Sequence, residues 1–441
     1  MSTQKRASLF ILFLLLSLTL TQSITAQSQE VYQSYLPVVT RYLGYRESTG
    51  VLDPRFGDDG VVVTSFDRYA LVEALALQQD GKILAVGMRD LVRYNPDGSL
   101  DTSFDYDGKV LIRYGDGFEG FAVALQQDGK ILVAGYVYQT DHGYDFALAR
   151  FNPDGSPDSA FGTNGLASTD FNSNTDSAYA VVQQPDGKIL LGGSAYGGDA
   201  PSGTLYDFAL ARYNPDGSLD ESFDNDGKLT ADFHQKDDLG YDLALQPDGK
   251  ILLAGTAYDC PYACFALARY TSEGSLDPSF GNGGWVTADM EDRNDTASAM
   301  LLQPDGKVLM AGNSTSAQDD YVPHWAAVRY HPDGALDLGL GVDGKLITRW
   351  GYRSEANALA LQPDGKIVLA GYMSLTSDTQ FALARYTSEG SLDASFAGGG
   401  QLITTQNGMA YAMLIQPDGR ILIGGYTYDE SGYSMALLRF K

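Results

Sequence analysis

The strongest feature of the sequence is a pattern of polar and apolar positions that recurs seven times along the chain. Each copy has a polar turn centred on Asp-Gly, followed by an almost continuously apolar run such as KILLAG at 250–255. Proline and glycine favour tight turns, and a short apolar run is typical of a strand covered on both faces. The turns are QQDGKIL at 78–84 and 126–132, QPDGKIL at 184–190 and 246–252, QPDGKVL at 303–309, QPDGKIV at 362–368 and QPDGRIL at 416–422.

The copy around residue 250 predicts four short strands. They cover 241–246, 250–255, 265–270 and 285–288, with a second turn at 272–274 before the last. Four antiparallel strands that are apolar on both faces cannot be buried alone, so neighbouring copies must stack. The pattern therefore predicts an all-β fold, a seven-bladed β-propeller of four-stranded antiparallel blades.

The two ends of the repeat region complement each other. The last copy ends at Phe440 without a fourth strand, and residues 50–64 match the fourth-strand block at 274–287. We therefore expect the N-terminal strand to complete the last blade and close the ring, which removes unpaired strand edges.

The N-terminal residues differ from the repeats. Lys5 and Arg6 precede an apolar run at 7–20, and the small residues before Gln27 suit a cleavage site. The run is shorter than the ~20 residues that span a bilayer, so a signal peptide is predicted at 1–26, with an uncleaved membrane anchor as the alternative. Residues 27–48 are interpreted as a linker and 49–441 as the propeller.

Composition and net charge limit the classes of partner that the protein can bind. The chain is 44% hydrophobic and 20% charged, which is typical of a globular protein. Its net charge of −26 becomes −28 when residues 1–26, with two basic and no acidic residues, are removed. This charge argues against nucleic acid and anionic membranes as partners. We expect a monomer, secreted or at the cell surface, with no membrane insertion after cleavage.

The only two cysteines are Cys260 and Cys264. A close pair in an exported chain predicts a disulfide, since two cysteines without a nearby histidine make a poor zinc site.

The repeated unit, ALALQPDGK followed by FALARYNPDGSLDxSFG, resembles the bacterial delta-60 repeat family over about 49–441. The resemblance implies a β-propeller in an extracellular setting. It implies no chemistry, because the family carries no general assigned activity.

The loops between the second and third strands vary most between copies, so a ligand site is expected on their face. Tyrosine offers a flat apolar ring with a polar tip, which suits contact with a glycan or a protein. The candidate ligand-binding residues are Tyr138, Tyr144, Tyr196, Tyr206, Tyr258, Tyr321, Trp325 and Tyr428. Packing between blades is the alternative role for each of them.

Acidic residues lead into the innermost strands, at or within one residue of the same repeat position. In a closed ring they would surround the mouth of the central channel and repel one another unless a cation lay among them. The candidate metal ligands, with calcium as the candidate cofactor, are Glu119, Asp176, Asp238, Asp295 and Glu355. Solvated charges too far apart to share an ion are the alternative.

Enzyme motifs are scarce. The chain has four histidines and neither a G-x-S-x-G nor an H-E-x-x-H pattern, which argues against an enzyme. The main hypothesis is a secreted, non-catalytic binding or adhesion module with a glycan or extracellular protein ligand. One alternative is a propeller-type glycoside hydrolase or polysaccharide lyase that uses the carboxylates at the channel mouth. The other is a structural surface component with no discrete site.

Overall fold

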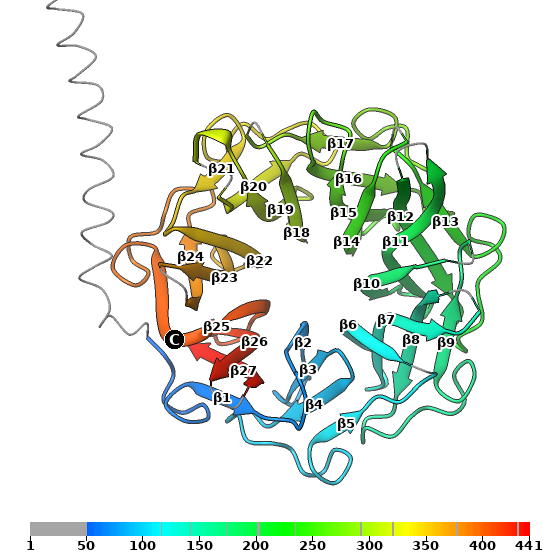
Figure 1. The fold of residues 1–441 in the computed structure, drawn as a ribbon, viewed down its shortest axis with the longest axis horizontal. Helices are drawn as coiled ribbons and strands as arrows, with labels where there is room; N and C mark the ends of the chain where they lie inside the picture. Colours follow the sequence, from blue (N-terminus) through cyan, green and yellow to red (C-terminus); the bar gives the residue numbers. More distant parts are fainter. Residues whose placement is uncertain are drawn as a thin grey trace, which may run out of the picture. The chain divides into compact units, whose positions relative to one another are not determined.

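The computed structural model describes residues 51–441 except 116, 142, 173, 201–202, 234, 292, 320–321, 376–377 and 430–431, and only the backbone of 198–200 and 203–204. The predicted signal peptide and linker lie outside the described residues. One compact unit covers Gly50–Lys441, and its sheets are arranged in a ring (Figure 1). No helix in the described part of the chain is long and apolar enough to cross a membrane.

Five sheets of the ring are four-stranded antiparallel blades, each formed by consecutive strands. Their strands are β2 (Ala74–Leu77), β3 (Ile83–Gly87), β4 (Asp90–Tyr94) and β5 (Lys109–Leu111); β6 (Phe118–Leu125), β7 (Ile131–Gln139), β8 (Gly143–Phe151) and β9 (Leu166–Thr169); β10 (Ser177–Gln183), β11 (Ile189–Ala200), β12 (Gly203–Tyr213) and β13 (Lys228–Ala231); β14 (Asp238–Leu245), β15 (Ile251–Ala257), β16 (Cys264–Tyr270) and β17 (Trp285–Ala288); β18 (Asp295–Leu302), β19 (Val308–Ser314), β20 (His324–Tyr330) and β21 (Lys345–Thr348). The 3-10 helix η1 (Ala317–Asp319) lies between β19 and β20.

The remaining strands form one seven-stranded sheet, so the prediction of seven four-stranded blades is wrong: the structure has five. The order in this sheet is β1 (Val61–Thr64), β27 (Gly432–Phe440), β26 (Ile421–Asp429), β25 (Gln401–Ile415), β24 (Thr379–Tyr386), β23 (Ile367–Ser374) and β22 (Arg353–Leu361).

The long strand β25 is the reason for the difference. Asn407 still pairs with β24, whereas Gly408 already pairs with β26. Elsewhere a loop, such as 289–294 between β17 and β18, separates the last strand of one sheet from the first of the next. Here the connection stays extended, so two predicted blades join into one sheet.

The ends of the unit pair as the complementary patterns predict. β1 runs antiparallel to β27, with Val61 opposite Leu438 and Thr64 opposite Met435. Because β27 lies between β1 and β26, the last strand has a hydrogen-bonded neighbour on each side.

Most of the core lies between successive sheets. The middle strands are buried on both faces, as in β15 and β16. One cluster joins Leu190 and Phe208 of one blade to Leu253 and Tyr270 of the next. Each sheet therefore depends on its neighbour for burial of its apolar face.

The glycine that ends each KILLAG-type run has a steric role. A Cβ on Gly255 would lie 1.9 Å from the carbonyl oxygen of Leu239, so no other residue fits opposite this point of β14. The register of β14 shifts there between Gly240 and Asp242, which leaves Tyr241 as the extra residue of a β-bulge.

An arginine on the third strand of each repeat pairs with an aspartate, and in six of the seven repeats it also links its sheet to the next. Arg269 Nε lies 2.8 Å from Asp277, its guanidinium lies over the Phe280 ring at 4.5 Å, and it donates to the carbonyl of Pro332 in the next sheet. Burial alone would raise the pKa of Asp277, but hydrogen bonds from Ser279 and the charges around it hold that pKa well below its usual range. The equivalent pairs are Arg93–Asp101, Arg150–Asp158, Arg212–Asp220, Arg329–Asp337, Arg385–Asp393 and Arg439–Asp53, of which Arg385–Asp393 is partly buried and the others are buried.

Removing one of these arginines is expected to destabilise the ring. The Arg269→Ala variant leaves Asp277 buried without its guanidinium and breaks the bond to Pro332, so we expect a loss of about 3–5 kcal/mol. Denaturant unfolding measures it. The control is Arg113→Ala, which removes an exposed arginine. Equal losses in both variants would contradict a special role for the buried arginine.

Candidate functional site

The antiparallel strand order divides the loops between two faces of the ring. The Asp-Gly turns, such as 78–82 and 95–99, lie on one face, which we call the turn face. The loops between second and third strands, such as 139–143 and 257–264, and the connections between sheets lie on the other, which we call the variable face.

Aromatic residues at the β-bulges form a chain along the inner edge of the ring. Phe121, Tyr179 and Tyr241 are the bulge residues of β6, β10 and β14, the innermost strands of three successive blades (Figure 1). Their ring centroids are 5.2 Å apart for Phe121–Tyr179 and 5.5 Å apart for Tyr179–Tyr241. The shift of one residue at each bulge lets the side chains of neighbouring blades contact one another along the inner edge.

Carboxylates lie beside this aromatic chain. Glu73, directly before β2, is partly buried, and burial together with the charge of Glu119 raises its pKa to about 7. The negative charge of Glu73 in turn helps to raise the pKa values of Tyr179 and Tyr411, after burial as the main cause. Sequence reasoning missed Glu73, because β2 begins one residue after it without a recognisable bulge pattern.

Two groups of tyrosines extend the aromatic surface onto the variable face. Tyr144 contacts Tyr136 and Tyr138 with ring centroids 4.6 Å and 5.3 Å apart. Tyr69 contacts Tyr433 at 5.0 Å, and both are more than two-fifths exposed. Exposed rings that already contact one another present flat apolar surface at little further cost in side-chain entropy.

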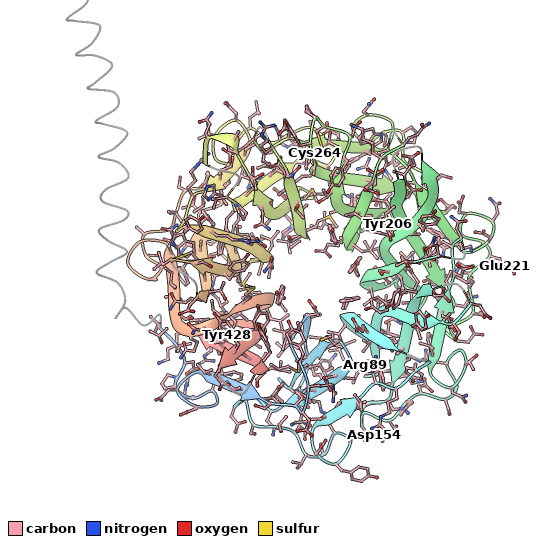
Figure 2. The ribbon with its side chains drawn as sticks, viewed as in Figure 1. Arg89, Asp154, Tyr206, Glu221, Cys264 and Tyr428 are labelled. Carbon is pink, nitrogen blue, oxygen red and sulfur yellow. A yellow bond between two sulfur atoms is a disulfide. The ribbon has the colours of Figure 1, made fainter. Side chains whose placement is uncertain are left out.

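The other predicted ligand-binding residues differ in their surroundings. Tyr196 and Tyr206 face each other across the β11–β12 hairpin at 6.4 Å, and Tyr258 is 40% exposed. Tyr206 and Tyr428 are labelled in Figure 2, on two different sheets. The hydroxyl of Tyr428 accepts a hydrogen bond from Thr379 N at 3.1 Å.

Trp325 is a correction to the predicted set, and Tyr321 lies outside the described residues. The Trp325 side chain is fully buried and contacts the Trp350 ring at 5.2 Å. Its position on β20 faces the core between sheets rather than the loop face, so Trp325 is not a surface contact residue.

The five predicted metal ligands do not form one ring of carboxylates. Three of them accept hydrogen bonds from a backbone N–H five residues earlier: Asp176 from Phe171, Asp238 from Phe233 and Asp295 from Met290. The other two, Glu119 and Glu355, lie one position further along their strands. Glu119 accepts a hydrogen bond from the Tyr136 hydroxyl at 2.5 Å, and Glu355 pairs with Arg353.

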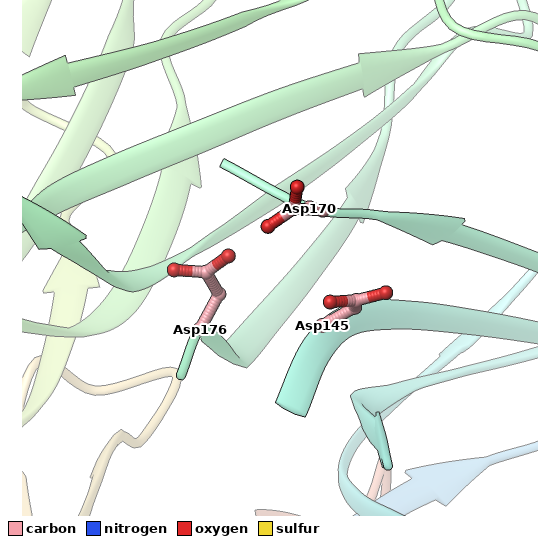
Figure 3. Close-up of side chains that lie close together, drawn as sticks. All are labelled: Asp145, Asp170 and Asp176. Atoms are coloured by element: carbon pink, nitrogen blue, oxygen red, sulfur yellow. The ribbon is translucent and has the colours of Figure 1, made fainter. Parts of the chain in front are cut away.

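Acidic residues do come together in two groups between successive sheets. Asp145, Asp170 and Asp176 form one group, in which the three carboxylates converge (Figure 3). Asp207, Asp232 and Asp238 form the equivalent group one sheet further along. In each group one ligand atom per residue lies within 4.8 Å of the others. Burial first, and neighbouring acids second, raise the pKa of Asp207 to about 6.

Cys260 and Cys264 form a disulfide, with their Cα atoms 6.0 Å apart. A cavity of about 440 Å³ lies on the turn face, and its lining includes Arg420 and Arg439, which both pair with Asp53. This cavity is lined by the charge pairs that link the sheets.

Antiparallel blades around an inner edge of β-bulges define a β-propeller. Seven segments of the chain match a family model, at 78–104, 126–161, 184–223, 246–280, 303–339, 362–396 and 416–441, which together are more than half of the chain. The chain belongs to this family, described as "Domain of unknown function (DUF5122) beta-propeller". A propeller repeat family is therefore confirmed, and the delta-60 name stays a prediction.

Solved structures with low sequence identity resemble the chain. They include virginiamycin B lyase from Staphylococcus aureus (10% identity, 86% of this chain and 98% of that chain, TM-score 0.46) and a protein of unknown function from Dyadobacter fermentans (12%, 87% and 100%, 0.45). A glucose dehydrogenase is also similar (12%, 72% and 95%, 0.39). We draw nothing about function from likenesses at this level. A search of curated proteins finds no match.

The raised pKa of Glu73 leads to a prediction about stability. A carboxyl whose pKa is higher in the folded than in the unfolded chain stabilises the fold at low pH, and this contribution is lost as pH rises through about 7. The Glu73→Gln variant stays neutral, so its melting temperature should exceed that of the wild type at pH 8, by roughly 1–3 °C.

The same comparison at pH 5 should show a smaller difference. The control is Glu221→Gln, which changes an exposed residue at the outer edge of the ring (Figure 2). A Glu73→Gln effect that is equal at pH 5 and pH 8 would rule out the ionisation of Glu73 as its cause.

Proposed function

We propose that this chain is a secreted, non-catalytic binding module that holds a glycan along the inner edge of the ring and on the adjoining variable face. The observation that carries the proposal is the continuous aromatic chain of Phe121, Tyr179 and Tyr241, with carboxylates beside it. Aromatic faces pack against the apolar faces of sugar rings, and carboxylates accept hydrogen bonds from sugar hydroxyls.

Charge restricts the kind of glycan. With a net charge of −26 over the whole chain, the protein repels anionic polymers, so the proposed ligand is a neutral or amino sugar chain. The exposed pair Tyr138 and Tyr144 lies on one hairpin and offers a second contact point for an extended ligand. Export rests on the predicted signal peptide at 1–26, and an extracellular protein is the other class of partner.

A double variant tests the proposal. Replacing Tyr138 and Tyr144 with alanine removes two rings that contact each other and are each 37% exposed. We expect glycan affinity to fall about tenfold, which corresponds to ~1.4 kcal/mol, measured by calorimetry on a glycan selected from an array.

The matched control is Tyr106→Ala, because Tyr106 is 94% exposed but lies in a turn-face segment. This variant should bind as tightly as the wild type. If no neutral or amino glycan binds the wild type, or if Tyr106→Ala weakens binding as much as the double variant, the proposal fails.

One observation favours a second candidate function, glycoside hydrolysis. Burial and the charge of Glu119 raise the pKa of Glu73 to about 7, so this carboxyl is partly protonated near neutral pH, as a general acid must be, and Glu119 is a second carboxylate beside it. In this candidate Glu73 donates the proton and Glu119 acts as base or nucleophile.

An assay of released reducing ends over a panel of polysaccharides separates the two functions. Under the binding proposal we expect no turnover by the wild type. Turnover that disappears in both Glu73→Gln and Glu119→Gln, while Glu221→Gln remains active, would replace the binding module with the hydrolase.

A further inference from the structure

Three chain positions meet wherever one four-stranded blade adjoins the next: the start of the third strand, the residue after the fourth strand, and the start of the next innermost strand. The strand register gives the residues at the first of these positions in three blades. Asp145 lies opposite Val137, Asp207 lies opposite Ala195, and Cys264 lies opposite Ala257. The fold therefore accepts a cysteine where two of the junctions have an aspartate. An all-acidic set is not a requirement of the architecture.

The set formed by Asp207, Asp232 and Asp238 has the dimensions of a site for one ion. One carboxylate oxygen of each residue lies within 4.8 Å of the others. Calcium binds oxygen at about 2.3–2.6 Å, so two ligands on opposite sides of a single ion lie about 5 Å apart.

Two of these three carboxylates are buried with unused hydrogen-bonding capacity. Asp238 is fully buried, and its Oδ2 accepts from Phe233 N, while its Oδ1 has no partner in the described part of the chain. Asp207 is 7% exposed and accepts no hydrogen bond from any described residue. Buried carboxylates without partners are costly, and a cation bound among them would remove that cost.

At the preceding junction, the aspartate that corresponds to Asp238 is satisfied by the protein itself. Both oxygens of Asp176 accept backbone hydrogen bonds, from Phe171 and Tyr196. In addition, Lys228 Nζ lies 2.5 Å from the backbone oxygen of Asp170, which brings a positive charge to that group.

At the junction that holds Asp207, an uncharged residue occupies the position that Lys228 occupies at the preceding junction. Lys228 pairs with Ala211 on β12, and the residue in the same register on the next sheet, opposite Ala268, is Trp285. The Trp285 ring stacks on Phe233 at 4.9 Å. Among the described residues, no lysine or arginine forms an ion pair with Asp207, Asp232 or Asp238.

We infer that Asp207, Asp232 and Asp238 bind one divalent cation, and that this cation is calcium. The donors are all oxygen atoms, which suits a hard cation and disfavours zinc, whose structural sites use nitrogen and sulfur. The ion would connect β12 of one blade to β14 of the next, beside Tyr206. This inference does not depend on glycan binding.

Calcium titration of the chelator-treated full chain tests the site without any glycan. We expect calorimetry to show one bound calcium per chain, with a dissociation constant of roughly 10⁻⁴–10⁻³ M, typical of extracellular modules. The melting temperature should rise with calcium and fall when a chelator is added. Absence of calcium binding, or a melting temperature that calcium leaves unchanged, would overturn the inference.

Asparagine variants locate the ion. Asp207→Asn should abolish calcium binding while leaving the calcium-free melting temperature equal to or above that of the wild type, because it removes a buried charge that lacks a partner. Asp232→Asn is the second variant. It changes an exposed residue, so folding should not be affected, and it should also lose binding.

The matched control is Asp145→Asn, which makes the same change at the equivalent position of the preceding junction. It should bind calcium as the wild type does. Wild-type affinity in Asp207→Asn and Asp232→Asn, or loss of binding in Asp145→Asn instead, would show that the ion is not held by this set.

Discussion

The buried pair of arginine and aspartate in each repeat is the interaction on which the ring depends. The arginine side chain extends from the third strand of its repeat and pairs with an aspartate of the same repeat. In six of the seven repeats it also donates a hydrogen bond to a backbone carbonyl of the following repeat. A guanidinium has five donors in a fixed planar arrangement, so it reaches both partners with little loss of side-chain freedom, whereas the ammonium of a lysine lacks this fixed geometry. Arg439 makes these contacts with Asp53 and Pro96, and so joins the last sheet to the first.

The arginine–aspartate pairs separate scaffold from variation. The pair recurs in every repeat, and most of the arginines donate to a turn carbonyl of the next repeat, so the turn face is nearly the same around the ring. The variable face does not carry these contacts between sheets, and its hairpins differ in length and in residue content. The aromatic chain, the exposed tyrosines and both acidic groups are built from bulges, hairpins and connections rather than from the repeated turns.

The sequence predicted the strands, the stacking and the pairing of the two ends well, because strand period, turn residues and repeated blocks are local features. The sequence predicted less well those features that depend on a shift of a single residue along a strand. Asp176 and Glu119 lie one position apart in the repeat, and neighbouring residues of a strand point to opposite faces, so the predicted ring of carboxylates separates into two sets. The joined sheet was missed for a similar reason: whether 404–407 bends or stays extended is decided by tertiary pairing.

The pairing of β1 with β27 has a consequence for the order of folding. Val61–Thr64 is synthesised long before its partner strand Gly432–Phe440, because the two strands are far apart in the sequence. Until then, the first strand has no neighbour and the open edges at both ends can pair with other chains. Contacts so distant in sequence form slowly, because a long loop must be closed first. Closure is thus a late step, and a chain that is truncated or delayed before β27 is exposed to misassembly.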